Sequence, residues 1–190
     1  FTLPGMVFIY YGEELGMKNV PIPPQYVQDP AAKGDPKTGI GRDPERTPMQ
    51  WSGDSNAGFS TFNNTWLPIS PDYETRNVEI ERNNQDSFLS LYKTLIAIRR
   101  NSETLRHGKL EVLSLENPNI VGYTRTNGQD QYATFINFSS NKTTCYTDKV
   151  VLKRLVASSD PKSEVLPNRN GVIELRPYEA ALFLVAYPNT

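Results

Sequence analysis

Apolar residues near the start of the chain form one short run, Val7 to Tyr11, which lies between Pro4-Gly5 and Gly12. A continuous apolar run of this kind is typical of a strand buried on both faces, as in a parallel sheet or an α/β barrel. An isolated strand would leave its backbone groups unpaired, so we expect its neighbours to come from outside this sequence. Glu13 and Glu14 follow the run directly, at the position where α/β barrels carry functional groups; structural acids are the alternative.

The next regular pattern appears only after a long irregular stretch. Five prolines between Lys18 and Ile40 exclude a long helix or an inner strand there. From Asn84 to Arg100, apolar residues recur at three- and four-residue spacing, which predicts a helix with Asn84 as its N-cap. We expect its apolar face to pack against a barrel or a sheet.

After Gly108 the pattern changes to short apolar runs separated by turn residues such as Asn127-Gly128. The predicted strands are 110–115, 120–125, 132–138, 150–156, 172–175 and 180–185, with a further turn cluster at 167–171. Such a series indicates an antiparallel sandwich. We predict a boundary directly after the helix, with one domain over residues 1–107 and the sandwich over residues 108–190.

Composition narrows the class of protein. The 190 residues are 37% hydrophobic with a formal net charge of −1, which is typical of a globular chain with no basic stripe for nucleic acid. No apolar run approaches the ~20 residues that cross a bilayer. The start at Phe1 has neither an initiator methionine nor a basic leader, so we expect it to be an interior position of a longer protein.

Cysteine and histidine are too few for several kinds of site. Cys145 is the only cysteine and His107 the only histidine, so no disulfide, thiolate metal site or nucleophile–histidine arrangement can be assembled within the chain. We expect no metal and no cofactor, and His107 is expected in a polar turn between helix and strand.

Three glycosylation sequons occur, at Asn63, Asn137 and Asn141. In a chain with sixteen asparagines, roughly two sequons are expected by chance. They mark possible glycosylation sites and leave the compartment, cytoplasmic or secreted, open.

The stretch with the most chemistry is Gly41-Arg42-Asp43-Pro44-Glu45-Arg46-Thr47-Pro48-Met49-Gln50-Trp51, followed by Asn56-Ala57-Gly58-Phe59. Its prolines predict a structured loop. An arginine fork can hold paired oxygens of a carboxylate or of vicinal sugar hydroxyls, and Trp51 adds a flat apolar face. The alternative is a structural cluster in which arginines and acids only pin the loop.

These motifs, together with Phe1-Thr2-Leu3-Pro4-Gly5 and Ile9-Tyr10-Tyr11-Gly12-Glu13-Glu14-Leu15-Gly16-Met17, resemble the C-terminal third of an α-glucosidase of the α-amylase superfamily, glycoside hydrolase family 13. The most similar branch is that of maltases and oligo-1,6-glucosidases. The resemblance implies an α+β chain: the last strand, long loop and last helix of a (β/α)8 TIM barrel, then the antiparallel β-sandwich called domain C.

The resemblance also implies retaining hydrolysis of terminal α-linked glucose in maltose, isomaltose, sucrose or short oligosaccharides. The family's catalytic carboxylates would lie upstream of Phe1, so we assign no catalytic residue here and expect the chain alone to be inactive. Arg42 would contact the glucose. The residues expected to support its loop are Asp43, Arg46, Glu14 and Trp51, with Phe59 in packing.

Other functions remain open. A transglucosidase or sucrose isomerase shares the fold, and so does the non-enzymatic heavy subunit of amino-acid transporters, which is anchored by a membrane helix. An intact Arg42-Asp43 loop favours an enzyme. The sandwich as an independent carbohydrate-binding module is a third possibility, but the sequence shows no stripe of exposed aromatic residues to support it. The expected partners are an oligosaccharide substrate and the remainder of the barrel.

Overall fold

The computed structural model describes residues 1–34, 41–163, 165 and 171–186. The chain divides into two compact units, one made of Phe1–Val7 with Lys93–Thr190 and the other of Phe8–Tyr92. The end of the proline-rich stretch, 35–40, and most of the predicted turn at 167–171 lie outside the described residues. The domain boundary after residue 107 stays a prediction.

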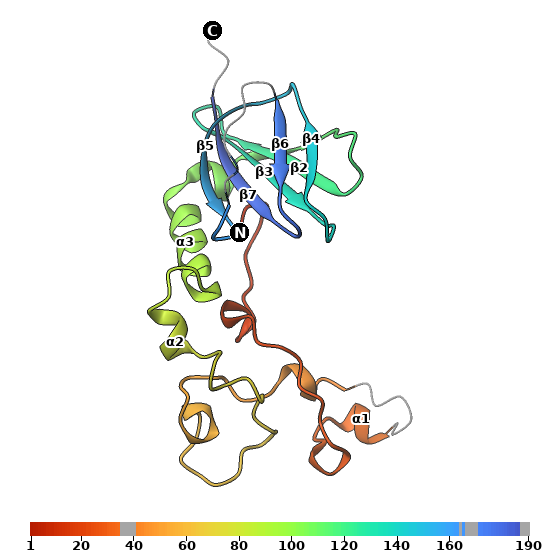
Figure 1. Cartoon of the computed structure of the whole chain (residues 1–190), viewed down its shortest axis with the longest axis vertical. Helices are drawn as coiled ribbons and strands as arrows, with labels where there is room; N and C mark the ends of the chain where they lie inside the picture. Colours follow the sequence, from red (N-terminus) through yellow and green to blue (C-terminus); the bar gives the residue numbers. More distant parts are fainter. Residues whose placement is uncertain (35–40, 164, 166–170, 187–190) are drawn as a thin grey trace. The chain divides into compact units, whose positions relative to one another are not determined.

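The first unit contains two antiparallel sheets (Figure 1). The larger sheet has the order β1-β2-β3-β7-β5, and the smaller one pairs β4 with β6. The strands are β1 (Lys109–Leu113), β2 (Ile120–Thr126), β3 (Gln131–Asn137), β4 (Thr143–Tyr146), β5 (Val151–Ser158), β6 (Val172–Leu175) and β7 (Ala180–Ala186). The predicted antiparallel sandwich is confirmed, and β4 is a strand that the sequence pattern did not predict.

Alternating apolar side chains of both sheets form one core. Phe135 on β3 and Phe183 on β7 are fully buried, and their rings meet edge to face with centroids 6.2 Å apart. Cys145 and Ile173 of the smaller sheet belong to the same buried cluster. The burial of apolar side chains from both sheets is the main stabilisation of the sandwich.

Two arginines attach the beginning of the chain to this unit. Arg125 on β2 is 1% exposed. Its guanidinium donates to the carbonyl oxygen of Gly108, at 3.1 and 2.8 Å, and to that of Thr2 at 2.7 Å. Arg99 donates at 2.6 to 2.9 Å to the carbonyl oxygens of Phe1, Leu3, Gly5 and Leu105. We call these two side chains the arginine clamp.

The helices follow the predicted region with different bounds. α3 (Phe88–Asn101) begins four residues later than expected, because Ser87 caps it by accepting from the amide of Ser90 at 3.2 Å. Asn84 instead accepts from the amide of Asp86 in the preceding turn. No residue of α3 is fully buried, and Leu89 in its first turn packs against the cluster of Leu15, Met49 and Val78. α4 (Glu103–His107) was not predicted, and His107 is its exposed last residue rather than part of a turn.

The second unit is mostly irregular. Its short elements are η1 (Glu13–Leu15), η2 (Pro24–Tyr26), α1 (Pro30–Gly34), η3 (Asp43–Glu45), η4 (Ser55–Gly58) and α2 (Val78–Arg82). The expected strand at Val7–Tyr11 is absent, and Phe8 is 84% exposed. No strand among the described residues pairs with Val7–Tyr11, and the sequence analysis expects the neighbours of this strand to come from outside the chain. A small core of Leu15, Met49 and Val78 holds the unit.

Candidate functional site

The Arg42-Asp43 pair is fixed by a residue from the proline-rich stretch. Asp29 Oδ2 accepts from the Arg42 amide at 2.8 Å and from Arg42 Nε at 3.0 Å. Its other oxygen, Oδ1, accepts from the amide of Ala31 in the first turn of α1. The Asp29 carboxylate is almost fully buried, while the Arg42 side chain is 61% exposed. The base of the arginine is therefore held in place while its outer end remains open.

The electrostatics of this pair keep both groups charged. Hydrogen bonds from Arg42 hold the pKa of Asp29 well below its ordinary range. The same side-chain hydrogen bond raises the pKa of Arg42. Among the described residues, the terminal nitrogens Nη1 and Nη2 of Arg42 have no hydrogen-bond acceptor and no carboxylate partner. The arrangement leaves a fork of donors available to a ligand.

Asp43 has the opposite environment. It is 4% exposed, and its Oδ2 accepts from the amides of Gln28 and Asp29 at 2.6 and 2.9 Å. Gly41 allows the two segments to approach, because a Cβ at that position would lie 2.7 Å from Cβ of Ala32. Asp43 thus fastens the loop to residues 28–29 and has a structural role in its position.

The segment Asn56 to Phe59 fixes the C-terminal end of the Gly41–Trp51 motif. The Ala57 carbonyl accepts from the amides of Trp51 and Ser52 at 2.8 and 3.0 Å. Ala57 is fully buried and has a φ of 56°, a left-handed conformation that costs an alanine free energy. The strained turn positions the backbone of Trp51.

Gln50 links the same segment to the chain before α2. It is fully buried, and Nε2 donates to Asp72 Oδ1 at 3.0 Å and to the Arg76 carbonyl at 2.7 Å. Although burial opposes ionisation of Asp72, the hydrogen bonds from Ser70, Arg76 and Gln50 lower its pKa. Met49 and Gln50 are therefore internal, and only Trp51 of this triplet reaches the surface.

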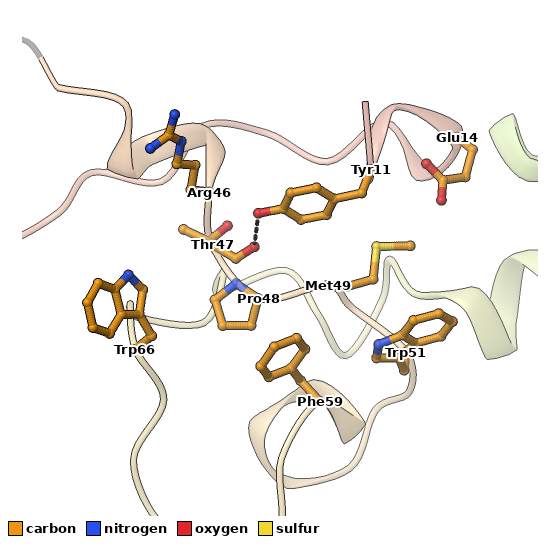
Figure 2. A pocket seen from close by; sticks show the side chains of 9 residues that line it. All are labelled: Tyr11, Glu14, Arg46, Thr47, Pro48, Met49, Trp51, Phe59 and Trp66. Atoms are coloured by element: carbon orange, nitrogen blue, oxygen red, sulfur yellow. Dashed lines mark hydrogen bonds between the residues drawn. The ribbon is translucent and has the colours of Figure 1, made fainter. Parts of the chain in front are cut away.

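A pocket of about 440 Å³ lies beside these motifs (Figure 2). Its lining is largely aromatic and apolar: Tyr11, Pro48, Met49, Trp51, Phe59 and Trp66, with Glu14, Arg46 and Thr47. Trp51, Phe59 and Trp66 are 50%, 49% and 71% exposed. Exposed aromatic side chains around a hollow of this size are typical of a surface that contacts a ligand or another part of a protein.

The residues expected to support the loop have different surroundings. Glu14 Oε2 accepts from the amide of Gly12 at 2.8 Å, so this acid stabilises its own turn. Arg46 is exposed and lines the pocket. Two residues of the site were given no role in it from the sequence: Asp29, which orients Arg42, and Tyr11, whose hydroxyl donates to the Thr47 carbonyl at 3.0 Å.

Among the described residues, no group of His, Cys, Asp or Glu side chains is arranged to hold a metal ion. In the same parts of the chain, no helix is long and apolar enough to cross a membrane.

Comparison with known families identifies these motifs. Residues 1–108 match the family described as "Alpha amylase, catalytic domain". The chain belongs to the α-amylase family. The resemblance inferred from the sequence is confirmed, and the α-amylase-type match ends where the first strand of the sandwich begins.

Named relatives of this α-amylase family chain are glucosidases. It is 32% identical to an oligo-1,6-glucosidase of Parageobacillus thermoglucosidasius, over 97% of this chain and 36% of the relative. It is 36% identical to maltase A1 of Drosophila melanogaster, over 75% of this chain and 25% of the relative. The chain thus spans about a third or less of the length of these relatives.

Solved structures are also similar to this chain in fold. The trehalulose synthase of Pseudomonas mesoacidophila matches with a TM-score of 0.87 and 28% identity, over 97% of this chain and 36% of that one. The isomaltulose synthase of Erwinia rhapontici, solved with D-glucose, matches with a TM-score of 0.86 and 28% identity, over 98% and 36%. Proteins similar to this chain therefore include glucosidases, a trehalulose synthase and an isomaltulose synthase.

Proposed function

We propose that this chain is the C-terminal part of a retaining α-glucosidase that hydrolyses terminal α-linked glucose from maltose, isomaltose, sucrose or short oligosaccharides. The catalytic carboxylates belong to the part of the protein that precedes Phe1, and this chain contributes to binding the glucose. The glucosidase and maltase relatives support this proposal.

One observation carries the proposal: the geometry of Arg42. Asp29 holds Nε and the amide of Arg42, so the orientation of the side chain is set at its base. A purely structural arginine would use its terminal nitrogens within the protein, whereas the side chain of Arg42 is 61% exposed. A planar fork held in this way suits vicinal hydroxyls of a sugar.

The test is Arg42→Lys in the full-length protein. Lysine keeps the charge but loses the planar fork and the Nε contact to Asp29. Charge-assisted hydrogen bonds to a desolvated partner contribute about 1.5–3 kcal/mol, so we expect kcat/KM for p-nitrophenyl α-glucoside to fall roughly ten- to a hundredfold.

Arg100→Lys on α3 is the matched control, because Arg100 is exposed and lies outside the motif. It should leave both kcat/KM and the melting temperature unchanged. If Arg42→Lys lowers the melting temperature while kcat/KM stays normal, Arg42 is a structural residue and the proposed glucose contact is wrong.

A second function has one specific observation in its favour. The two synthases described above match the fold with TM-scores of 0.87 and 0.86. A transglucosidase or sucrose isomerase uses the same glucosyl-enzyme but passes the glucose to a sugar instead of water. Product analysis with sucrose separates the two: a glucosidase releases glucose and fructose in equal amounts, whereas an isomerase forms a new disaccharide. The transporter-subunit alternative predicts neither product.

A further inference from the structure

Two of the three sequons lie close together on the sandwich, and the structure gives their asparagines opposite environments. Asn137 is the last residue of β3 and is 1% exposed. Asn141 lies four residues later, in the connection between β3 and β4, and is exposed. Asn63, in the other unit, is also exposed.

The Asn137 carboxamide uses its full hydrogen-bonding capacity within the protein. Nδ2 donates to the carbonyl oxygens of Asn141 and Arg176, both at 2.8 Å. Oδ1 accepts from the amide and the hydroxyl of Ser139 at 2.9 and 2.8 Å. A carboxamide has two donor hydrogens and one oxygen with two lone pairs, so no capacity remains. Asn137 joins the end of β3 to the residue after β6 and closes the turn between β3 and β4.

Asn141 contributes its backbone rather than its side chain. Its carbonyl oxygen accepts from Asn137 Nδ2, and its backbone amide donates to the Ser139 hydroxyl oxygen at 3.4 Å. Its carboxamide has no hydrogen-bond partner among the described residues and lies at the surface. A substituent on this nitrogen would displace no contact of the fold.

We propose that Asn141 accepts an N-linked glycan and that Asn137, despite its sequon, is a structural asparagine that stays unmodified in the folded protein. In the transfer, the amide nitrogen displaces the diphosphate of a lipid-linked sugar from C1. A C–N bond forms, the C–O bond to the diphosphate breaks, and the nitrogen gives up one proton. At Asn137 that proton is one of the two hydrogens bonded to buried carbonyls, and the sugar would need space inside the sandwich.

The first experiment secretes the full-length protein from insect cells. Glycans are removed by amidase in ¹⁸O water, which marks each former glycosylation site as labelled aspartate. Asn137 and Asn141 fall in one tryptic peptide, residues 126–142, and its fragment spectra separate them. We expect label at Asn141 and at Asn63, and none at Asn137. Label at Asn137 in the natively folded secreted protein, or an empty Asn141, overturns the proposal.

A second experiment isolates the effect of folding. A soluble N-glucosyltransferase with UDP-glucose is applied to the folded full-length protein and to the same protein unfolded in urea and diluted into the assay. Asn141 should be modified in both samples, and Asn137 only after unfolding, with occupancy on the order of tenfold lower or less in the folded sample. Equal occupancy of Asn137 in the two samples contradicts the proposal.

Asn141→Gln is the matched control for both experiments. It should remove all sugar from the 126–142 peptide while leaving the melting temperature unchanged, because the contacts of Asn141 use its backbone atoms. Sugar that persists on this peptide would have to be at Asn137 and would refute the assignment.

Discussion

Arg125→Met should weaken the sandwich, although it replaces a buried charge with a shorter, apolar side chain. Arg125 is 1% exposed, and no carboxylate among the described residues forms an ion pair with it. Burial, with a smaller contribution from Arg99, lowers its pKa. Removing the charge therefore relieves a desolvation cost, and the effect of the substitution depends on what its hydrogen bonds contribute.

The contacts set the expected magnitude. Methionine leaves the buried Gly108 carbonyl without both of its Arg125 donors and the half-buried Thr2 carbonyl without one. An unsatisfied buried carbonyl costs about 1–3 kcal/mol, and a lost hydrogen bond at a half-buried site about 1 kcal/mol. After the relief of desolvation, we expect a net loss of about 2–3 kcal/mol in the free energy of unfolding.

Cys145 provides the assay. It is the only cysteine, it is 5% exposed in the core of the sandwich, and burial raises the pKa of its thiol to about 11. The folded chain should therefore resist a thiol reagent at pH 8, and labelling should follow unfolding. A short labelling pulse across a urea series gives the unfolding curve. A loss of 2–3 kcal/mol lowers the urea midpoint by about 1 M.

Arg154→Met is the control, since Arg154 lies exposed on β5 of the same sheet. The urea midpoint of Arg154→Met should equal that of the unsubstituted chain within experimental error. If Arg125→Met changes the free energy of unfolding by no more than Arg154→Met, the hydrogen bonds of Arg125 are not a net stabilisation and the reasoning fails.

Three further outcomes are expected. The chain alone should release no p-nitrophenol from the α-glucoside, because the proposed function assigns the attacking and protonating carboxylates to the part of the protein before Phe1; release above a heat-killed control would contradict this. Arg42 lowers the pKa of Asp29 in the folded chain, so as the pH falls the Asp29 carboxylate takes up a proton at a higher pH in the unfolded chain than in the folded one. The free energy of unfolding should therefore decrease as the pH drops from about 5 to 2. Asp29→Asn should flatten that dependence in urea titrations at each pH, and an unchanged slope would argue against the pair. Ala57→Gly relieves a left-handed alanine and should raise the unfolding free energy by up to about 1 kcal/mol; calorimetry showing a lower melting temperature would contradict the strain.

The strand pattern of the sandwich was predictable because alternating apolar residues report a strand's buried face. β4 was missed for the same reason: of its four residues, Thr143-Thr144-Cys145-Tyr146, only Cys145 is buried. Its place in the sheet comes from pairing with β6, for example Cys145 opposite Ile173, and a single sequence carries no signal for that partner. The helix was found from its period, whereas its start depended on whether Asn84 or Ser87 supplied the cap.

The site was predictable to a similar extent. Proline and glycine marked the Arg42-Asp43 loop as structured, and the motif identified the residues with donors. Asp29 could not be found, because it lies thirteen residues before Arg42 and the two meet only when the loops fold together. The burial of Asn137 could not be predicted either, since the three residues of a sequon do not differ between a surface turn and the buried end of a strand.

The arginine clamp has a consequence for synthesis on the ribosome. Residues Phe1 to Gly5 leave the exit tunnel long before Arg125. β7 leaves after all the other described strands of the sheet, although it lies between β3 and β5. The carbonyl of Thr2 therefore has no Arg125 donor until β2 has been made, and the sheet that contains β2 is complete only once β7 has been added. A polypeptide truncated before Ala180 would lack the strand that joins β5 to β3 and should be recognised as unfinished by chaperones and proteases.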